Sequence, residues 1–210
     1  MAIDPKAFKA PFIDKNECWR EADNFRAQYW PSGVIPVDVL AIAEFDLDLE
    51  IRTIPRLKED ADIDALLLGD WKTLIVDQQQ YQDDRYLNRL RFSIAHELGH
   101  YVLHKAVYEQ IPRGSPEEWI FFMRHIPDKE YSFIEYHANE FAGRLLVPVE
   151  DLNWAFEEVL LETEKNGLPR NRLTDAFLEY LYAPLADRFA VSPGVIEQRL
   201  LREKLWPLTT

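Results

Sequence analysis

Residues 91–104 read Arg91-Phe92-Ser93-Ile94-Ala95-His96-Glu97-Leu98-Gly99-His100-Tyr101-Val102-Leu103-His104, with the pattern H-E-x-x-H at positions 96–100. Residues four apart on a helix lie one above the other, so the imidazoles of His96 and His100 point the same way. Two neutral imidazoles aimed at one point supply two ligands of a tetrahedral zinc site. Glu97 falls beside that point, where a carboxylate can take a proton from activated water. The stretch therefore predicts a helix that carries a zinc hydrolase site.

The surroundings of this motif indicate that the helix is buried. It contains more apolar residues than a free surface helix carries, namely Phe92, Ile94, Ala95, Leu98, Val102 and Leu103. Gly99 in the middle of the helix costs roughly 1 kcal/mol relative to alanine, which indicates that something approaches it closely. A ligand and a tightly packed neighbouring element explain Gly99 equally well.

The composition indicates one globular unit. The 210 residues are 47% hydrophobic and 29% charged, which is enough to bury a sizeable core. The start of the chain has no apolar signal region, and no run approaches the roughly 18 apolar residues of a membrane span. The one cysteine, Cys18, excludes an internal disulfide and a cysteine-based zinc site. We therefore expect a cytoplasmic protein that does not bind membranes.

The formal net charge of −13 argues against direct binding of nucleic acid, because neutralising phosphates requires clustered Lys and Arg. Residues 185–200 faintly resemble a helix-turn-helix. In that tail, however, Glu197 and Glu203 lie beside Arg199 and Arg202. We therefore interpret the tail as a structural pair of helices.

The hydropathy pattern predicts an α+β fold with a small three-stranded sheet ahead of the motif helix. Residues 47–54 alternate as a half-buried strand does, and residues 65–69 and 73–77 form two further strands joined as a hairpin. Helical periodicity and end signals predict helices at residues 17–26, 34–45, 132–147, 149–165, 173–189 and 193–204.

A catalytic zinc usually takes three protein ligands and leaves one position for water. The third ligand must come from outside the motif, and the candidates are His104, His125, Glu135, His137 and Glu140. His104 lies on nearly the same helix face as His96 but about two turns away. One straight helix does not easily wrap three such side chains around one ion, so His104 fits a supporting or packing role better.

Glu135 has two interpretations. With Ser132 it fits a capping box at the start of a helix. As a zinc ligand it would have Asn139 one turn away to hydrogen-bond a ligating histidine, and Gly143 on the same face would leave room near the ion. Spacing favours Glu135 over His125 and His137 without excluding either.

The two motifs together resemble those of the ImmA/IrrE family of metallopeptidases. The second motif reads Glu135-x-x-Ala138-Asn139-x-Phe141-Ala142-x-x-Leu145-Leu146-x-Pro148, which fits the Glu-x-x-x-Asp/Asn pattern of thermolysin-like gluzincin sites. The resemblance covers residues 34–148 and implies that Zn2+ is held by His96, His100 and Glu135. It also implies that Glu97 is the general base and that Asn139 orients a ligating histidine.

The resemblance also implies an architecture, in which the sheet packs on a zincin-type helical core with a helical C-terminal extension. We divide the chain into an aromatic-rich arm (1–32), a zinc peptidase core (33–166) and a C-terminal helical pair (167–210) of the same globular unit. The loop at residues 106–131 lies outside both motifs, and we expect it to influence the choice of substrate.

The function implied is that of an intracellular endopeptidase. Many relatives act on a helix-turn-helix transcriptional repressor, which relieves repression in a stress or mobile-element response. The alternative is a non-cleaving regulator that binds and inactivates a repressor or a toxin-antitoxin-type partner. A peptidase also requires a group that stabilises the oxyanion, and the sequence does not choose among Tyr101, His104, His125, Tyr131 and His137.

Overall fold

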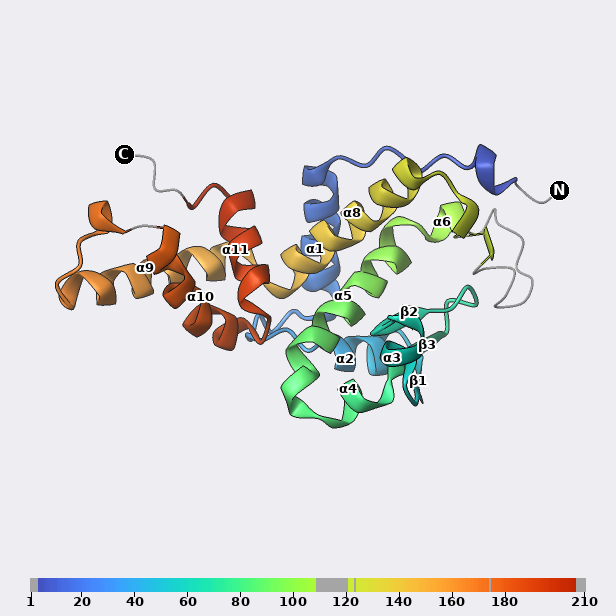
Figure 1. The fold of residues 1–210 in the computed structure, drawn as a ribbon, viewed down its shortest axis with the longest axis horizontal. Coiled ribbons are helices and arrows are strands. Elements are labelled where there is room, and N and C mark those ends of the chain that lie inside the picture. The colour runs from blue at the N-terminus through green and yellow to red at the C-terminus, as the bar shows by residue number, and fades with distance from the viewer. Residues whose placement is uncertain (1–3, 109–120, 123, 174, 207–210) are drawn as a thin grey trace.

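Two long helices cross the centre of the molecule, and a small sheet lies against one of them (Figure 1). The computed structural model describes residues 4–108, 121–122, 124–173 and 175–206. Helices predominate over three short strands, which confirms the predicted α+β fold. Half of the loop that we expect to influence substrate choice, residues 109–120 and 123, lies outside the described residues.

The sheet is mixed, with strand order β1-β3-β2. Its strands are β1 (Glu50–Ile54), β2 (Ala65–Leu67) and β3 (Thr73–Asp77). β1 runs parallel to β3, whereas β2 pairs with β3 as the predicted antiparallel hairpin. The Asp70 side chain closes that hairpin by accepting hydrogen bonds from the backbone N–H groups of Lys72 and Thr73. β1 begins three residues later than predicted, because Asp48 ahead of it has a left-handed conformation with φ of 53°.

The H-E-x-x-H motif lies on α5 (Leu87–Leu103), which packs along α8 (Asp128–Leu146) and also contacts β2. The two helices approach most closely at Gly99. A Cβ there would lie 3.0 Å from the Cα of Ala138 and 3.1 Å from its carbonyl oxygen. Of the two explanations for Gly99, the structure therefore shows the tightly packed neighbouring element.

Arg91 connects α5 to segments far apart in the sequence. Its buried guanidinium donates one hydrogen bond to the carbonyl of Val37 and another, of 3.2 Å, to the carbonyl of Ala190. A buried guanidinium is costly unless its N–H groups find acceptors. The first residue of the quoted stretch therefore fixes the motif helix between the N-terminal and C-terminal parts of the chain.

α8 begins four residues earlier than predicted, at Asp128. Ser132 consequently lies inside the helix, where its hydroxyl donates to the Asp128 carbonyl at 2.8 Å, and the capping-box interpretation of Glu135 is wrong. The expectation that Gly143 leaves room near an ion is also wrong. A Cβ at Gly143 would lie 3.1 Å from Cδ of Arg199, so this glycine accommodates an arginine from another helix.

The remaining helices surround this central pair. In the described part of the chain they are α1 (Lys15–Tyr29), α2 (Val39–Ala41), α3 (Leu57–Ala61), α4 (Gln78–Gln82), α6 (Lys105–Tyr108), α9 (Val149–Lys165), α10 (Asp175–Phe189) and α11 (Pro193–Arg202), with 3-10 turns at Pro5–Ala7, Asp84–Tyr86 and Arg170–Arg172 and a π-helical turn at Ile42–Asp46. α1 covers α8, and α9, α10 and α11 form the end of the molecule away from the sheet (Figure 1).

The prediction from the sequence failed for one helix and succeeded for another. The helix predicted at 34–45 is wrong in its first half, because Pro36 disfavours helical geometry at the residue before it. The helix begins only after Asp38, whose side chain accepts a hydrogen bond from the Ala41 N–H. By contrast, α9 matches its predicted bounds. None of the described helices has the length and apolar character that crossing a membrane requires.

Replacing Gly99 with alanine is expected to destabilise the fold, because the added methyl group forces α5 and α8 apart. We expect the free energy of unfolding, measured by urea denaturation, to fall by about 1–3 kcal/mol. Gly194→Ala is the matched control, since a Cβ there would meet nothing closer than the Ser192 hydroxyl oxygen at 4.0 Å. Equal stability of the two variants would contradict the close contact.

Candidate metal centre and its pocket

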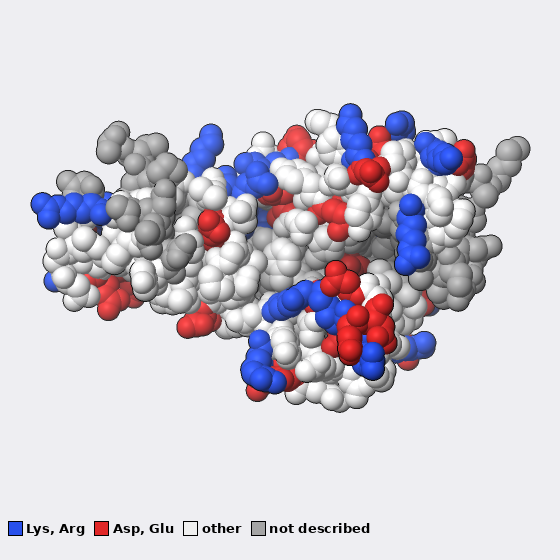
Figure 2. All heavy atoms as spheres, in the orientation of Figure 1, with Lys and Arg blue, Asp and Glu red and all other residues white. Residues whose placement is uncertain are grey.

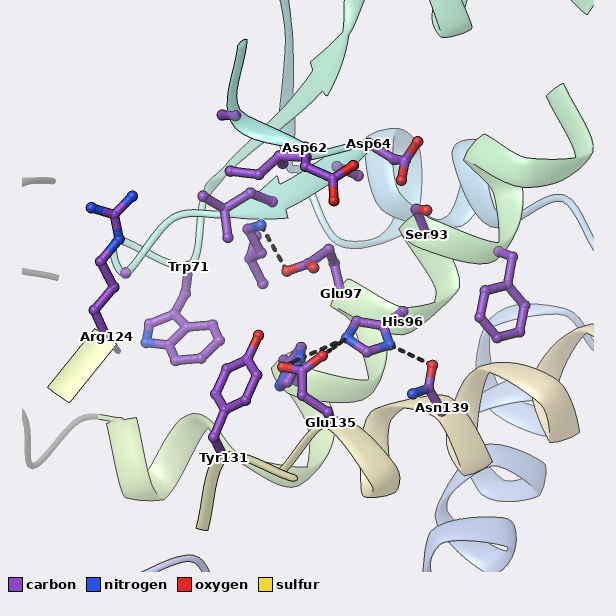
Figure 3. Close-up of a pocket in the computed structure, with 18 residues that line it drawn as sticks. Asp62, Asp64, Trp71, Ser93, His96, Glu97, Arg124, Tyr131, Glu135 and Asn139 are labelled. Atoms are coloured by element: carbon purple, nitrogen blue, oxygen red, sulfur yellow. Dashed lines mark hydrogen bonds and ion pairs between the residues drawn. The ribbon is translucent and has the colours of Figure 1, made fainter. Parts of the chain in front are cut away.

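Three side chains from α5 and α8 converge at the floor of a pocket (Figure 3). The Nε2 atoms of His96 and His100 lie 2.9 Å apart. The Glu135 carboxylate lies 3.3 Å from His96 Nε2 through Oε2 and 3.6 Å from His100 Nε2 through Oε1. Ligands about 2.0–2.1 Å from a tetrahedral zinc ion lie about 3.3 Å from one another. The donor atoms of these three residues therefore fit a zinc ion.

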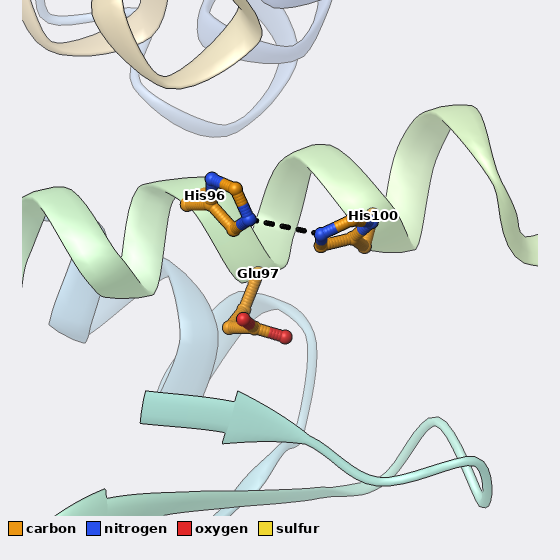
Figure 4. Close-up of side chains that lie close together, drawn as sticks. All are labelled: His96, Glu97 and His100. Atoms are coloured by element: carbon orange, nitrogen blue, oxygen red, sulfur yellow. Dashed lines mark hydrogen bonds between the residues drawn. The ribbon is translucent and has the colours of Figure 1, made fainter. Parts of the chain in front are cut away.

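Glu97 leaves α5 in a different direction and points toward the sheet (Figure 4). Its Oε2 accepts a hydrogen bond of 2.9 Å from the backbone N–H of Leu67 on β2. Donor atoms of Glu97, His96 and His100 nevertheless lie within 4.8 Å of one another. Burial raises the pKa of Glu97 to about 7, against the opposing effect of His96. A carboxyl group with a pKa near neutrality can both accept and return a proton.

The hydrogen bond at His96 Nδ1 and the burial of His100 favour a metal-binding state of the two rings. His96 Nδ1 lies 3.0 Å from Oδ1 of Asn139, and an N–H at Nδ1 leaves the Nε2 lone pair for a metal. Burial also acts to lower the pKa of His96, but Glu135 and Glu97 raise it overall. Burial lowers the pKa of His100 well below its ordinary value, and positive charge on His96 adds to that effect.

The structure separates Glu135 from two other candidates for the third ligand. His125 has a ring nitrogen 2.6 Å from the carbonyl of Phe121, and its ring stacks on the Phe121 ring. Glu140 points to the other side of α8, where it accepts a hydrogen bond of 2.9 Å from the Trp19 indole. Of these three side chains, Glu135 is the one that faces the imidazoles.

The remaining histidine candidates, His104 and His137, are buried behind His100 and do not line the pocket. Among the five candidates for an oxyanion group, Tyr131 lines the pocket. Figure 3 shows its hydroxyl directed toward the site beside Glu135. Burial and the nearby Glu135 carboxylate raise the pKa of Tyr131 to about 12, so its hydroxyl keeps its proton and can donate a hydrogen bond.

The pocket around these groups has a volume of about 570 Å3. β2 forms one wall, Trp71 of the hairpin and Arg124 stand near Tyr131, and Asp62 and Asp64 lie by the strand (Figure 3). Trp71 and Arg124 were not among the site residues predicted from the sequence. A bulky aromatic residue in a tight hairpin was a usable signal for Trp71, whereas nothing in the sequence marked Arg124.

Acidic and basic side chains are interspersed over the neighbouring surface, rather than forming a field of one sign (Figure 2).

The sequence of residues 81–201 matches the model of a family described as peptidase M78, the IrrE N-terminal-like domain. This match spans 121 of the 210 residues, which is more than half of the chain. It includes α5 and α8 with all three candidate ligands, but neither the sheet nor the N-terminal arm. No curated protein matches the chain.

Glu135→Ala is expected to reduce zinc binding strongly, because it removes the carboxylate that faces both imidazoles. Metal analysis after dialysis should find about one zinc per chain in the unmodified protein and a small fraction of that in the variant. His125→Ala is the control, since His125 bonds the Phe121 carbonyl and should leave zinc content unchanged. An equal loss in both variants would remove the support for Glu135 as a ligand.

Proposed function

Because the chain belongs to the peptidase M78 family of IrrE N-terminal-like domains, we propose that it is a zinc-dependent endopeptidase that hydrolyses a peptide bond in an intracellular protein. The observation that carries this proposal is the convergence of His96, His100 and Glu135 at distances of 2.9–3.6 Å. The carboxylate of Glu97 beside them supplies the acid–base group that hydrolysis requires.

Each residue of the site has a defined part in this mechanism. His96, His100 and Glu135 would hold the zinc ion. Zinc bound there supplies a Lewis acid that polarises the scissile carbonyl and makes water more acidic. Glu97 takes a proton from the attacking water and returns it to the leaving amine as the C–N bond breaks. The N–H of Leu67 holds the Glu97 carboxylate in position for both transfers.

Two further side chains support the reaction. Asn139 fixes the ring of His96 through the 3.0 Å contact at Nδ1, so that Nε2 faces the metal position. Tyr131 directs its hydroxyl into the pocket beside Glu135 and donates a hydrogen bond to the oxyanion that forms as water attacks the carbonyl.

The open edge of β2 provides a place for an extended substrate. Leu68 donates to the Thr73 carbonyl, and Asp64 accepts from the Asp77 N–H. Backbone groups of an antiparallel strand alternate in direction, so Ala65 and Leu67 turn theirs away from β3 and toward the pocket. The bond from Leu67 to Glu97 agrees with this direction. A substrate segment that adds to this edge as a strand lies beside the acid–base group.

For the substrate we propose a helix-turn-helix transcriptional repressor, whose cleavage relieves repression in a stress or mobile-element response. The resemblance of both motifs to ImmA/IrrE metallopeptidases supports this choice, and the net charge of −13 favours a protein target over nucleic acid. Incubating the zinc-loaded protein with the repressor encoded by the neighbouring gene, followed by mass spectrometry, tests it. A complex without fragments, unaffected by Glu97→Gln, would support the non-cleaving regulator instead.

Glu97→Gln is expected to keep zinc and lose cleavage. The amide has nearly the shape of the carboxylate but cannot accept the proton of water, so we expect the rate to fall by about 100- to 10,000-fold. Zinc content and cleavage are measured on the same preparation, and loss of the metal from this variant would contradict the role of base. Normal cleavage of a partner by the variant would show that the mechanism is wrong.

Tyr131→Phe is expected to lower kcat by about 100-fold, because a donor to the oxyanion disappears. Zinc content and thermal stability should stay unchanged, since Tyr131 is 42% exposed and the change removes only its hydroxyl. Tyr81→Phe is the matched control, a similarly exposed tyrosine on α4 that does not line this pocket. If the two variants cleave at the same rate, Tyr131 does not stabilise the oxyanion.

A further inference from the structure

The pocket of the candidate metal centre, here called the metal pocket, continues into a second space between α5, α8 and α11. This second space, the α11 hollow, has a volume of about 690 Å3. The residues that line both spaces are Asp64, Phe92, Ser93 and Asn139. Figure 3 shows Asp64, Ser93 and Asn139 on one side of the candidate ligands, with Trp71 and Arg124 on the other side. The α11 hollow therefore adjoins the metal pocket at the end away from Arg124.

One face of α5 and one face of α8 connect the two spaces. Residues three or four apart lie on the same face of a helix. From His96, this face of α5 leads back through Ser93 to Arg89. From Glu135, the corresponding face of α8 leads forward to Asn139. Because Arg89 lines the α11 hollow but not the metal pocket, a polypeptide that follows these faces away from the ligands enters the hollow.

The wall of the hollow that α11 provides is a single face of that helix. Val195, Gln198 and Arg202 line the hollow at spacings of three and four residues. The neighbouring face of α11 is buried in the core through Ile196 and Leu200, both of which are 0% exposed. The wall therefore has a fixed position relative to α8.

The charged side chains around the hollow are paired within the protein. Arg89 contacts both carboxylate oxygens of Asp64, at 2.8 and 3.0 Å. Arg202 lies 2.8 Å from the carboxylate of Glu140. Arg199, the third arginine of the hollow, is buried and pairs with the carboxylate of the C-cap residue of α11. A charged substrate side chain would lose hydration here without gaining an unpaired partner.

We propose that the α11 hollow is a second subsite for the polypeptide substrate and that it takes an uncharged residue some positions away from the scissile bond. The proposal rests on the proposed function, because a substrate reaches the hollow from the zinc site. Phe92 and Val195 are half-buried and offer apolar surface to such a residue. The peptidase is therefore expected to prefer substrates long enough to fill both spaces.

The first test measures the affinity of the zinc-loaded, full-length protein for peptide hydroxamates, in which the hydroxamate group chelates the metal and anchors one end of the peptide. Two series of increasing length, each ending in leucine, carry the hydroxamate at opposite ends of the peptide and so extend to opposite sides of the metal. Burial of the leucine in the α11 hollow should raise the affinity in one series by about 10- to 100-fold. Isothermal titration calorimetry measures it, and no gain with length in either series would overturn the proposal.

The second test fills the hollow with a larger side chain. Gln198→Trp is expected to remove the gain in affinity with length, because the indole occupies the space of the peptide. Glu197→Trp is the matched control, since Glu197 is the preceding residue of the same helix, is equally exposed and does not line the hollow. The control should keep the gain. An equal effect of the two variants would overturn the proposal, and the length series of the unmodified protein decides the question should Gln198→Trp lose thermal stability.

The third test replaces the terminal leucine of the best long hydroxamate with glutamate or lysine. Because the charges of the hollow are already paired, we expect both changes to lower the affinity about 10-fold or more. Tighter binding of either charged peptide would overturn the preference for an uncharged residue.

The shortest hydroxamate separates this proposal from the proposed function. It reaches only the metal, so its failure to bind would contradict the zinc site itself. Binding of the shortest compound without any gain from longer ones would overturn the second subsite and leave the zinc site supported.

Discussion

The close approach of α5 and α8 at Gly99 and Ala138 is the constraint on which the site depends. Each helix alone carries an incomplete set of candidate ligands, and only a short distance between the helix axes lets the Glu135 carboxylate reach two imidazoles on the neighbouring helix. A larger residue at position 99 would separate the axes and move Glu135 away from both nitrogens. The close contact of the two helices at Gly99 therefore determines whether the three donor atoms can bind one ion.

The polar groups around that point are each held by a different layer of the fold. The ring of His96 is oriented by Asn139 from α8, and the carboxylate of Glu97 by the backbone of Leu67 from the edge of the sheet. Nδ1 of His100 lies 2.9 Å from the buried ring of His104. Leu67 is the one of these supports that lies outside the matched region, so the matched sequence carries the candidate ligands while the edge of the sheet positions Glu97.

Local periodicity was sufficient to predict the hairpin, the motif helix and the bounds of α9, because each depends on residues close in sequence. The convergence of His96 and His100 was predictable for the same reason. Glu135 was only favoured, since its choice depends on which face of α8 meets α5. The roles predicted for Ser132 and Gly143 were wrong for the same reason. Tertiary packing decides where α8 begins and that Arg199 lies against Gly143, and the local sequence shows neither. The contact of Glu97 with the sheet uses a backbone N–H, which has no residue signature.

The contact between Glu97 and the sheet has a consequence for how such a site can diverge. Its donor is a backbone N–H, which any amino acid except proline supplies at position 67. Selection on this feature therefore acts on the position of the β2 edge and leaves the identity of the residue almost unconstrained, so sequence comparison would not detect it. Relatives that keep every candidate ligand but carry a β2 strand of another length or course can differ in how firmly this carboxylate is held.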